Sequence, residues 1–237
     1  MIEVSNIDVW GFEHAIRGMR NPLNSWNKSD SMMCYVKKFS DCKSDCEKCP
    51  RKNEEDFDND IFCVGKNDLD LMRRLYKAGS EHRKYLRQIF VSMDILAPLY
   101  WWKEMDQYRI NVTTNSCSTM HKIHAKEFTL DDFSHDHLFG DDTEMDVDES
   151  VGILNIVISA LNDLRDWYNK ENDKEYWHQM IQLLPSSYNQ KRTVTMNYEN
   201  VITIIKQRTG HKLDEWNQFV EILKSLPYVK EIISEGE

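Results

Sequence analysis

The chain contains 237 residues, of which 41% are hydrophobic, and it carries a formal net charge of −10 at pH 7. A chain of this length buries a substantial core without the help of disulfides or metal ions. Its acidic balance argues against a duplex nucleic acid as partner, because such binding needs a basic surface. The acidic balance does not argue against a phosphorylated small molecule as ligand, since a few local cations are enough to hold one phosphate.

The sequence contains no apolar run long enough to cross a bilayer, and its first ten residues lack the layout of a secretion signal. We therefore expect a soluble cytoplasmic protein without a membrane partner. Five of the six cysteines lie before residue 64. Disulfides are uncommon in the cytosol, so these thiols are expected to be reduced.

The first half of the chain predicts two helices separated by an insertion. Residues 12–20 form a short helical stretch that an Asn-Pro pair closes. Residues 40–68 are polar, charged and Cys-bearing, and they are typical of a loop or insertion. Asp68 is placed to cap a helix over residues 69–78, and Gly79 fits the end of that helix.

The middle of the chain predicts a strand followed by a helix. Apolar and polar side chains alternate over residues 89–95, which is the period of a strand. Ala97-Pro98 is then expected to open a helix, because proline is tolerated in its first turn. Tyr100, Trp101 and Trp102 are consecutive, so on a helix they cannot all face one core. The alternatives for these rings are core packing and contact with a planar ligand or another subunit.

The last part of the chain is mainly helical. Acidic residues crowd positions 131–149, which predicts a solvated loop. Residues 151–170 give the clearest amphipathic helix. Asn197 is placed to cap a helix that ends at Arg208, and a final amphipathic helix follows around Trp216.

Two strings of residues resemble the signature regions of the flavin-dependent thymidylate synthases. The first is residues 97–109 with 115–119, and the second is residues 197–211. The resemblance covers roughly residues 76–225 and depends on order and spacing more than on identity. It implies an α+β fold, with a mixed or antiparallel sheet flanked by long helices. We expect a single domain over residues 1–237, with the Cys-bearing insertion at about 40–68.

The family motif R-H-R-x-x-S-x-N-E-x-S-x-R-Y is degenerate in this chain. Aligned on Gln107-Tyr108-Arg109, it keeps only Arg109. Without a gap, Asn115 lies at the family glutamate and Cys117 at the family serine. With one inserted residue, Asn115 meets the family asparagine and Ser118 the serine. In both alignments the glutamate and the second arginine, which help to hold the nucleotide in the family, are missing.

The resemblance also assigns candidate roles. It implies cofactor contacts for His82 with its neighbours Arg83 and Lys84, and for Arg109, Asn197 and His211; substrate contacts for Gln107, Asn115 and Arg208; and catalysis for Cys117 or Ser118. Arginine suits phosphate because its planar fork pairs two oxygens, although most arginines are simply solvated. A thiolate at Cys117 would be a nucleophile, and a buried inert thiol is the alternative.

Cysteine spacing suggests a separate metal site. Cys42, Cys46 and Cys49, with Cys63 further along, would supply four thiolates to zinc or an iron–sulfur cluster. The spacing is not a paired C-x-x-C arrangement, so loose cysteines in a polar loop are the alternative.

The function that the resemblance implies is flavin-dependent modification of C5 of a pyrimidine nucleotide. The leading case is methylation of deoxyuridylate to thymidylate, with FAD bound and with methylene-tetrahydrofolate and NADPH as co-substrates. A homotetramer with shared sites is expected. The alternatives are an inactive nucleotide- or flavin-binding relative, and a divergent enzyme that uses another pyrimidine nucleotide or transfers hydroxymethyl.

Overall fold

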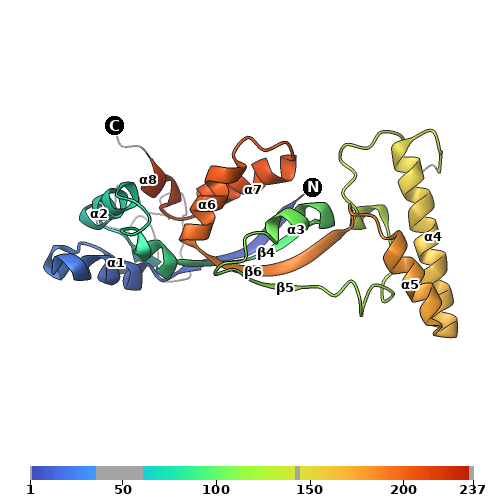
Figure 1. Ribbon diagram of the computed structural model, residues 1–237, viewed down its shortest axis with the longest axis horizontal. Helices are drawn as coiled ribbons and strands as arrows, with labels where there is room; N and C mark the ends of the chain where they lie inside the picture. Colours follow the sequence, from blue (N-terminus) through green and yellow to red (C-terminus); the bar gives the residue numbers. More distant parts are fainter. Residues whose placement is uncertain (1, 36–60, 142–144, 235–237) are drawn as a thin grey trace. The chain divides into compact units, whose positions relative to one another are not determined.

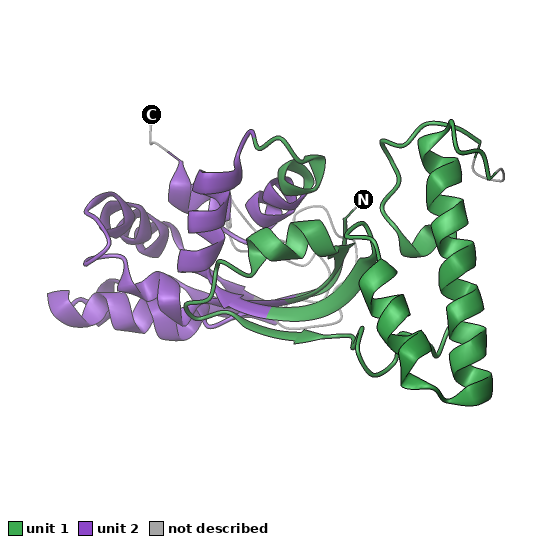
Figure 2. Cartoon of the chain, turned by 45° about the vertical axis from the view of Figure 1, so that its right-hand side comes forward, with its two compact units in different colours: residues 1–7, 93–194, 211–218 green, residues 8–92, 195–210, 219–237 purple. Residues whose placement is uncertain are grey.

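A computed structural model describes residues 2–35, 61–141 and 145–234 of the chain. Contacts divide it into two compact units, shown in different colours in Figure 2. Unit 1 comprises Met1–Ile7, Met93–Val194 and His211–Gln218; unit 2 comprises Asp8–Ser92, Thr195–Gly210 and Phe219–Glu237. Three strands continue from one unit into the other along the chain. The single domain expected from the sequence stays a prediction.

The described residues form one main sheet, a small second sheet and a set of helices (Figure 1). The main sheet has the strand order β1-β4-β6-β5, with bounds Glu3–Trp10, Phe90–Pro98, Asn189–Asn197 and Thr113–Ser116. The second sheet pairs β2 (Met32–Cys34) with β3 (Ile61–Cys63) in antiparallel register. The helices are α1 Phe12–Arg20, α2 Lys66–Lys77, α3 Leu99–Met105, α4 Ser150–Glu171, α5 Lys174–Leu183, α6 Tyr198–Arg208, α7 Asp214–Ser225 and α8 Val229–Ile233.

This combination of helices and antiparallel strands confirms the expected α+β class. Among the described helices, α4 is the long one, with 22 residues. None of the helices in the described ranges combines the length and the apolar character that crossing a bilayer requires.

In unit 2, α1 has the bounds predicted from the sequence. Its apolar positions at helical spacing are buried, and Phe12 meets the rings of Tyr198 and Tyr228 edge-on at 5.7 and 5.3 Å. Gly11 precedes the helix with a φ of +97°, and a Cβ there would lie 2.1 Å from the carbonyl oxygen of Gln88. Only glycine therefore fits this turn.

The start of α2 differs from the prediction. The helix begins at Lys66, not at residue 69, and Asp68 lies inside its first turn. The capping carboxylate belongs to Asp30, which accepts hydrogen bonds from the backbone N–H groups of Asn67 and Asp68 at 2.8 and 3.1 Å. Gly79 follows the helix with a φ of +115°, which confirms the predicted C-terminal stop.

The strand predicted over residues 89–95 is confirmed and extends through Pro98 as β4. The prediction that Ala97-Pro98 opens a helix is wrong by two residues, because both are extended and α3 begins at Leu99. Proline disfavours the helical region for its preceding residue, which explains the delay. Trp101 and Trp102 are both buried, and Trp101 packs on Trp216 at 4.7 Å. Core packing therefore accounts for both tryptophans.

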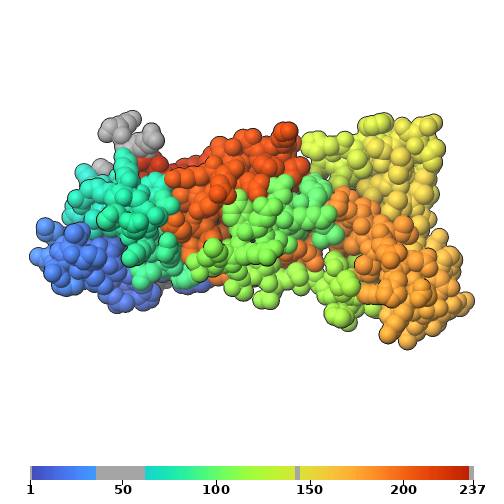
Figure 3. Space-filling view, viewed as in Figure 1, coloured from blue at the N-terminus to red at the C-terminus, as the bar shows by residue number. Residues whose placement is uncertain are grey.

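In unit 1, α4 and α5 pack together and share a core with Ile123, Phe128 and Phe133, and Figure 3 shows the two helices as one continuous surface. The predicted helix over residues 151–170 is confirmed, and the stripe containing Leu154, Ile158 and Leu161 faces this core. The described part of the acidic stretch 131–149 is largely exposed, as expected. Phe133 is the exception, because its side chain is 1% exposed and belongs to the core.

Candidate functional site

The residues singled out from the sequence fall into two groups. Unit 2 contains His82, Arg83, Lys84, Asn197 and Arg208; unit 1 contains Gln107, Arg109, Asn115, Cys117, Ser118 and His211.

In unit 2, α6 carries Asn197 and Arg208 at its two ends. The Asn197 side chain is buried, and its Oδ1 accepts a hydrogen bond from the backbone N–H of Asn200 at 3.1 Å, which confirms the predicted cap. Arg208 is the last residue of the helix. At 1.5 Å per residue the two ends are about 16 Å apart. The two side chains of one chain therefore do not meet around one small group.

Arg83 is engaged by a carboxylate that the sequence reasoning missed. Its Nε and Nη2 both donate to Oε1 of Glu199, at 3.1 and 2.7 Å, and each side chain is 20% exposed. Oε2 of Glu199 is buried and has no hydrogen-bond partner among the described residues. The only sequence signal was an acidic residue in the first turn of a helix, which the helix dipole favours in any case.

The neighbours of Arg83 are on the surface. His82 is an exposed turn residue, and Lys84 is the exposed first residue of the 3-10 helix Lys84–Gln88. The guanidinium of Arg83 also lies 5.5 Å from the ring centre of Tyr76, and Nζ of Lys206 lies 5.0 Å from the same ring. Unit 2 thus combines the Arg83 guanidinium and the Tyr76 ring with Glu199 from the first turn of α6 and Lys206 from its last turn.

In unit 1, most of the degenerate motif is on the surface. Gln107 and Arg109 follow the end of α3 and are exposed; Nε of Arg109 donates to the carbonyl oxygen of Asp106 at 3.0 Å. Asn115 is an exposed residue of β5. Cys117 and Ser118 come directly after this strand and are exposed, so the alternative of a buried thiol at Cys117 is wrong.

Two β6 residues that the sequence reasoning missed hold this surface segment. Nε2 of Gln190 donates to the carbonyl oxygen of Cys117 at 2.7 Å. Nη1 of Arg192 donates to Oδ1 of Asp106 at 2.8 Å, and its guanidinium lies 4.2 Å from the ring centre of Trp102. The alternating polarity of a strand does not indicate which residues its side chains contact when those partners are 73 and 86 positions away in the sequence.

His211 belongs to a polar cluster between α3 and the start of α7. Its Nδ1 accepts a hydrogen bond from the backbone N–H of Leu213 at 3.1 Å, which assigns the proton of the neutral ring to Nε2. Nε2 lies 3.5 Å from Oε2 of Glu104. Nearby, Tyr100 donates to Glu215, and burial together with this carboxylate raises the pKa of Tyr100. His211 is therefore held by contacts within unit 1.

The metal prediction falls mostly outside the described residues, where Cys42, Cys46 and Cys49 lie. Cys63 is buried, with a side chain 5% exposed, and stands opposite Met32 in the small sheet. Within the described ranges, no three His, Cys, Asp or Glu side chains are arranged to hold a metal ion.

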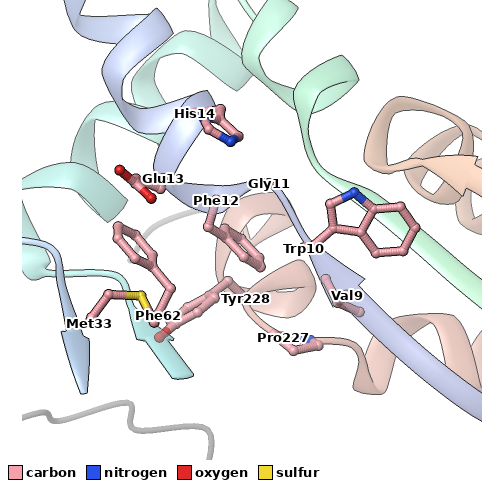
Figure 4. A pocket seen from close by; sticks show the side chains of 10 residues that line it. All are labelled: Val9, Trp10, Gly11, Phe12, Glu13, His14, Met33, Phe62, Pro227 and Tyr228. Carbon is pink, nitrogen blue, oxygen red and sulfur yellow. The ribbon is translucent and has the colours of Figure 1, made fainter. Parts of the chain in front are cut away.

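Unit 2 also contains a pocket that the sequence did not indicate (Figure 4). Its volume is about 300 Å3, and the close-up shows the rings of Phe12, Phe62 and Tyr228 gathered at its wall. Its lining is Val9, Trp10, Gly11, Phe12, Glu13, His14, Met33, Phe62, Pro227 and Tyr228. None of the residues singled out from the sequence lines it.

Comparison with known proteins identifies the fold. No protein-family model matches the chain, and no curated protein matches its sequence. Two crystal structures of the flavin-dependent thymidylate synthase ThyX from Helicobacter pylori with FAD and dUMP are similar, each at 16% identity, with TM-scores of 0.63 and 0.62. The matches cover 98% and 99% of this chain and 98% of each ThyX chain.

A third similar structure is a UMP/dUMP methylase, PolB from Streptomyces cacaoi, bound with 5-Br dUMP. It is 12% identical, with a TM-score of 0.59, and the match covers 98% of this chain and 92% of PolB. The resemblance predicted from the sequence is thereby confirmed at the level of the fold. The chain has the fold of the flavin-dependent thymidylate synthases.

Proposed function

We propose that the chain is a flavin-dependent enzyme that modifies C5 of a pyrimidine nucleotide. The leading reaction is methylation of deoxyuridylate to thymidylate, with methylene-tetrahydrofolate as carbon donor and NADPH as reductant. The observation that carries this proposal is the match over at least 98% of the chain to structures that hold FAD, dUMP or a brominated dUMP.

The residues at the start of α6 fit a flavin. The carbonyl oxygen of the Asn197 side chain is committed to the helix cap, while its amide nitrogen makes no hydrogen bond in the described part of the chain. Oε2 of Glu199, two residues further on, is a buried acceptor without a described partner. A flavin offers both N–H and hydroxyl donors as well as carbonyl acceptors, so it satisfies both groups. When bound, the flavin supplies the hydride.

The protein's own contribution is binding and orientation. Arg208 and Arg109 are proposed to hold phosphate oxygens, and Gln107 and Asn115 offer amides that match the imide edge of a pyrimidine. Cys117 presents an exposed thiol and Ser118 a hydroxyl beside it. We propose one of these two as the catalytic side chain.

A homotetramer with shared sites suits the distribution of these residues. Asn197 and Arg208 are separated by the length of α6, so a compact site needs groups from more than one chain. A second apolar face of α4 is exposed: the exposed fractions are 49% for Ile153, 37% for Ile156 and 48% for Trp167. Exposed apolar groups at helical spacing fit burial against other copies of the chain.

The second candidate is a relative that binds a nucleotide or flavin without catalysis. Two observations favour it: Arg83 is already paired with Glu199, and the family's glutamate and second arginine are absent from the motif. A site with fewer available cations is suited to binding more than to stabilising developing charge.

One experiment separates the two candidates. The purified chain is examined for flavin absorbance, reconstituted with FAD, and supplied with methylene-tetrahydrofolate, NADPH and either dUMP, UMP or dCMP. Methylated or hydroxymethylated nucleotide in the mass spectrum supports the enzyme. Bound flavin with no product from any of the three supports the binding relative. No flavin after reconstitution contradicts the enzyme and the flavin-binding form of the second candidate.

A further inference from the structure

The surface segment formed by residues 106–117 is fastened at both ends to the same stretch of β6. At its start, the Asp106 carboxylate accepts the hydrogen bond from Arg192 at 2.8 Å. At its end, the backbone N–H of Cys117 donates to the carbonyl oxygen of Lys191 at 2.9 Å, and the Cys117 carbonyl accepts from Gln190 at 2.7 Å. All of these residues belong to unit 1.

The two β6 side chains are themselves fixed. Nε of Arg192 donates to Oε1 of Gln190 at 2.9 Å, so the two side chains support each other. Trp102, which is 1% exposed, donates from Nε1 to the carbonyl oxygen of Gln190 at 2.9 Å and lies beneath the Arg192 guanidinium. Gln190 is 7% exposed. The Arg192 side chain is 14% exposed. A mutually bonded pair that is largely shielded from solvent is a rigid base for a surface segment.

The segment between the two fastened ends has little packing of its own. Most of its side chains are exposed, and Ile110 is 79% exposed. Residues 113–116 of the segment form β5, which pairs with β6 in the main sheet. The conformation of the segment therefore depends on this pairing and on the attachments at its two ends more than on a local core. The segment carries Gln107, Arg109 and Asn115, and Ser118 follows directly after it.

We propose that Gln190 and Arg192 are positioning residues for the nucleotide. They act through Asp106 and Cys117, holding the exposed amides, the arginine and the catalytic candidates in one arrangement before the ligand arrives. This role rests on the proposed function. The physical gain is preorganisation: a segment that is already ordered loses less conformational freedom on binding.

The sharpest test is Gln190→Glu. This substitution keeps the size of the side chain and its acceptor for Arg192, but it replaces the donor to the Cys117 carbonyl with a carboxylate oxygen. Gln182→Glu is the matched control, because Gln182 is an exposed residue of α5 and the charge change is the same. Arg192→Lys is the second variant, because it keeps the charge and removes both the fork and the stacking on Trp102.

Two measurements are made on each protein. Amide hydrogen exchange of the ligand-free chain should accelerate by about tenfold in peptides covering residues 107–119 of Gln190→Glu, with α4 unchanged. The KM for the nucleotide should rise by about tenfold while kcat changes less. Gln182→Glu should match the unmodified chain in both measurements. Arg192→Lys should also raise both the exchange rate in residues 107–119 and the KM for the nucleotide. This second variant provides the test if Gln190→Glu does not fold.

The outcomes are distinguishable. Unchanged hydrogen exchange in residues 107–119 for both β6 variants would show that Gln190 and Arg192 do not hold this segment, and it would overturn their positioning role. Accelerated exchange with unchanged KM would overturn the role in nucleotide binding, leaving only a structural attachment. An unmodified chain that binds no pyrimidine nucleotide overturns the proposed function and this role with it, and it is recognised because the exchange measurement needs no ligand.

Discussion

Arg20 and Asp68 form an ion pair in which both partners are buried, with Nε 2.5 Å from Oδ1 and side chains 4% and 0% exposed. The pair joins the end of α1 to the first turn of α2. Every other polar atom in it is also satisfied: Arg20 donates to Ser25 and to the carbonyl oxygen of Lys28, and Oδ2 of Asp68 accepts from Ser29, Asp30 and Ser31.

Asp68→Asn is expected to destabilise the chain strongly. The substitution leaves the Arg20 guanidinium buried without a counter-charge, which typically costs about 3–5 kcal/mol of the free energy of unfolding. Urea denaturation followed by circular dichroism measures the loss. Asp70→Asn is the control, because Asp70 is 49% exposed and its pairing with Arg73 is a surface contact. The control should lose less than about 1 kcal/mol; equal losses would contradict the role assigned to the buried pair.

The same carboxylate predicts a dependence of stability on pH. Burial alone would raise the pKa of Asp68, but hydrogen bonds from Ser31, Ser29 and Arg20 outweigh burial and lower it. The pKa in the unfolded chain is about 3.9. The folded value is the lower one, so this stabilisation is complete above about pH 4 to 5 and is lost as the pH falls through the folded pKa. Urea midpoints between pH 6 and pH 2.5 should fall less steeply for Asp68→Asn than for the unmodified chain.

Local patterns in the sequence predicted local structure, and long-range contacts stayed hidden. The α1, α4 and α6 helices and the Asn197 cap depend on residues within a few positions of each other. The role of Asp68 depends on Arg20, 48 positions away, and its place as cap is taken by Asp30 from a distant loop. The Gln190–Cys117 contact spans 73 positions and the Arg83–Glu199 pair 116. Pairings of this kind are set by how the elements pack, which periodicity does not encode.

Substitutions at Asn197 separate its cap from its proposed contact with the flavin. Asn197→Ala removes the cap and should cost about 1 kcal/mol of stability. Asn197→Asp keeps a side-chain oxygen for the cap but lacks the amide donor, and because position 197 is buried the new carboxylate also lowers stability. We expect both variants to lose bound flavin, measured by absorbance after reconstitution. Full flavin content in Asn197→Asp would argue that the amide does not contact the cofactor.

The cysteine spacing predicts a metal that is independent of the flavin. If the thiolates of Cys42, Cys46, Cys49 and Cys63 hold zinc or an iron–sulfur cluster, Cys46→Ser should purify with most of that metal missing. Elemental analysis and the visible spectrum measure the content. Cys117→Ser is the control, since Cys117 lies outside the predicted ligand set and should leave the metal unchanged. Equal metal content in the two variants would remove the prediction.

The Arg83–Glu199 pair predicts competition between a carboxylate and a phosphate. If Arg83 holds the diphosphate of FAD, Glu199 competes for the same N–H groups, and Glu199→Gln should strengthen that contact. Comparing FAD with riboflavin isolates the effect, because any change in contact with the ring is common to both ligands. We expect the ratio of FAD affinity to riboflavin affinity, measured by fluorescence quenching, to be about tenfold higher in Glu199→Gln than in the unmodified chain. This rise corresponds to roughly 1.4 kcal/mol. Arg83→Ala combined with Glu199→Gln should abolish the rise. A ratio that stays constant would place the diphosphate away from Arg83 and leave the pair as a structural contact of α6.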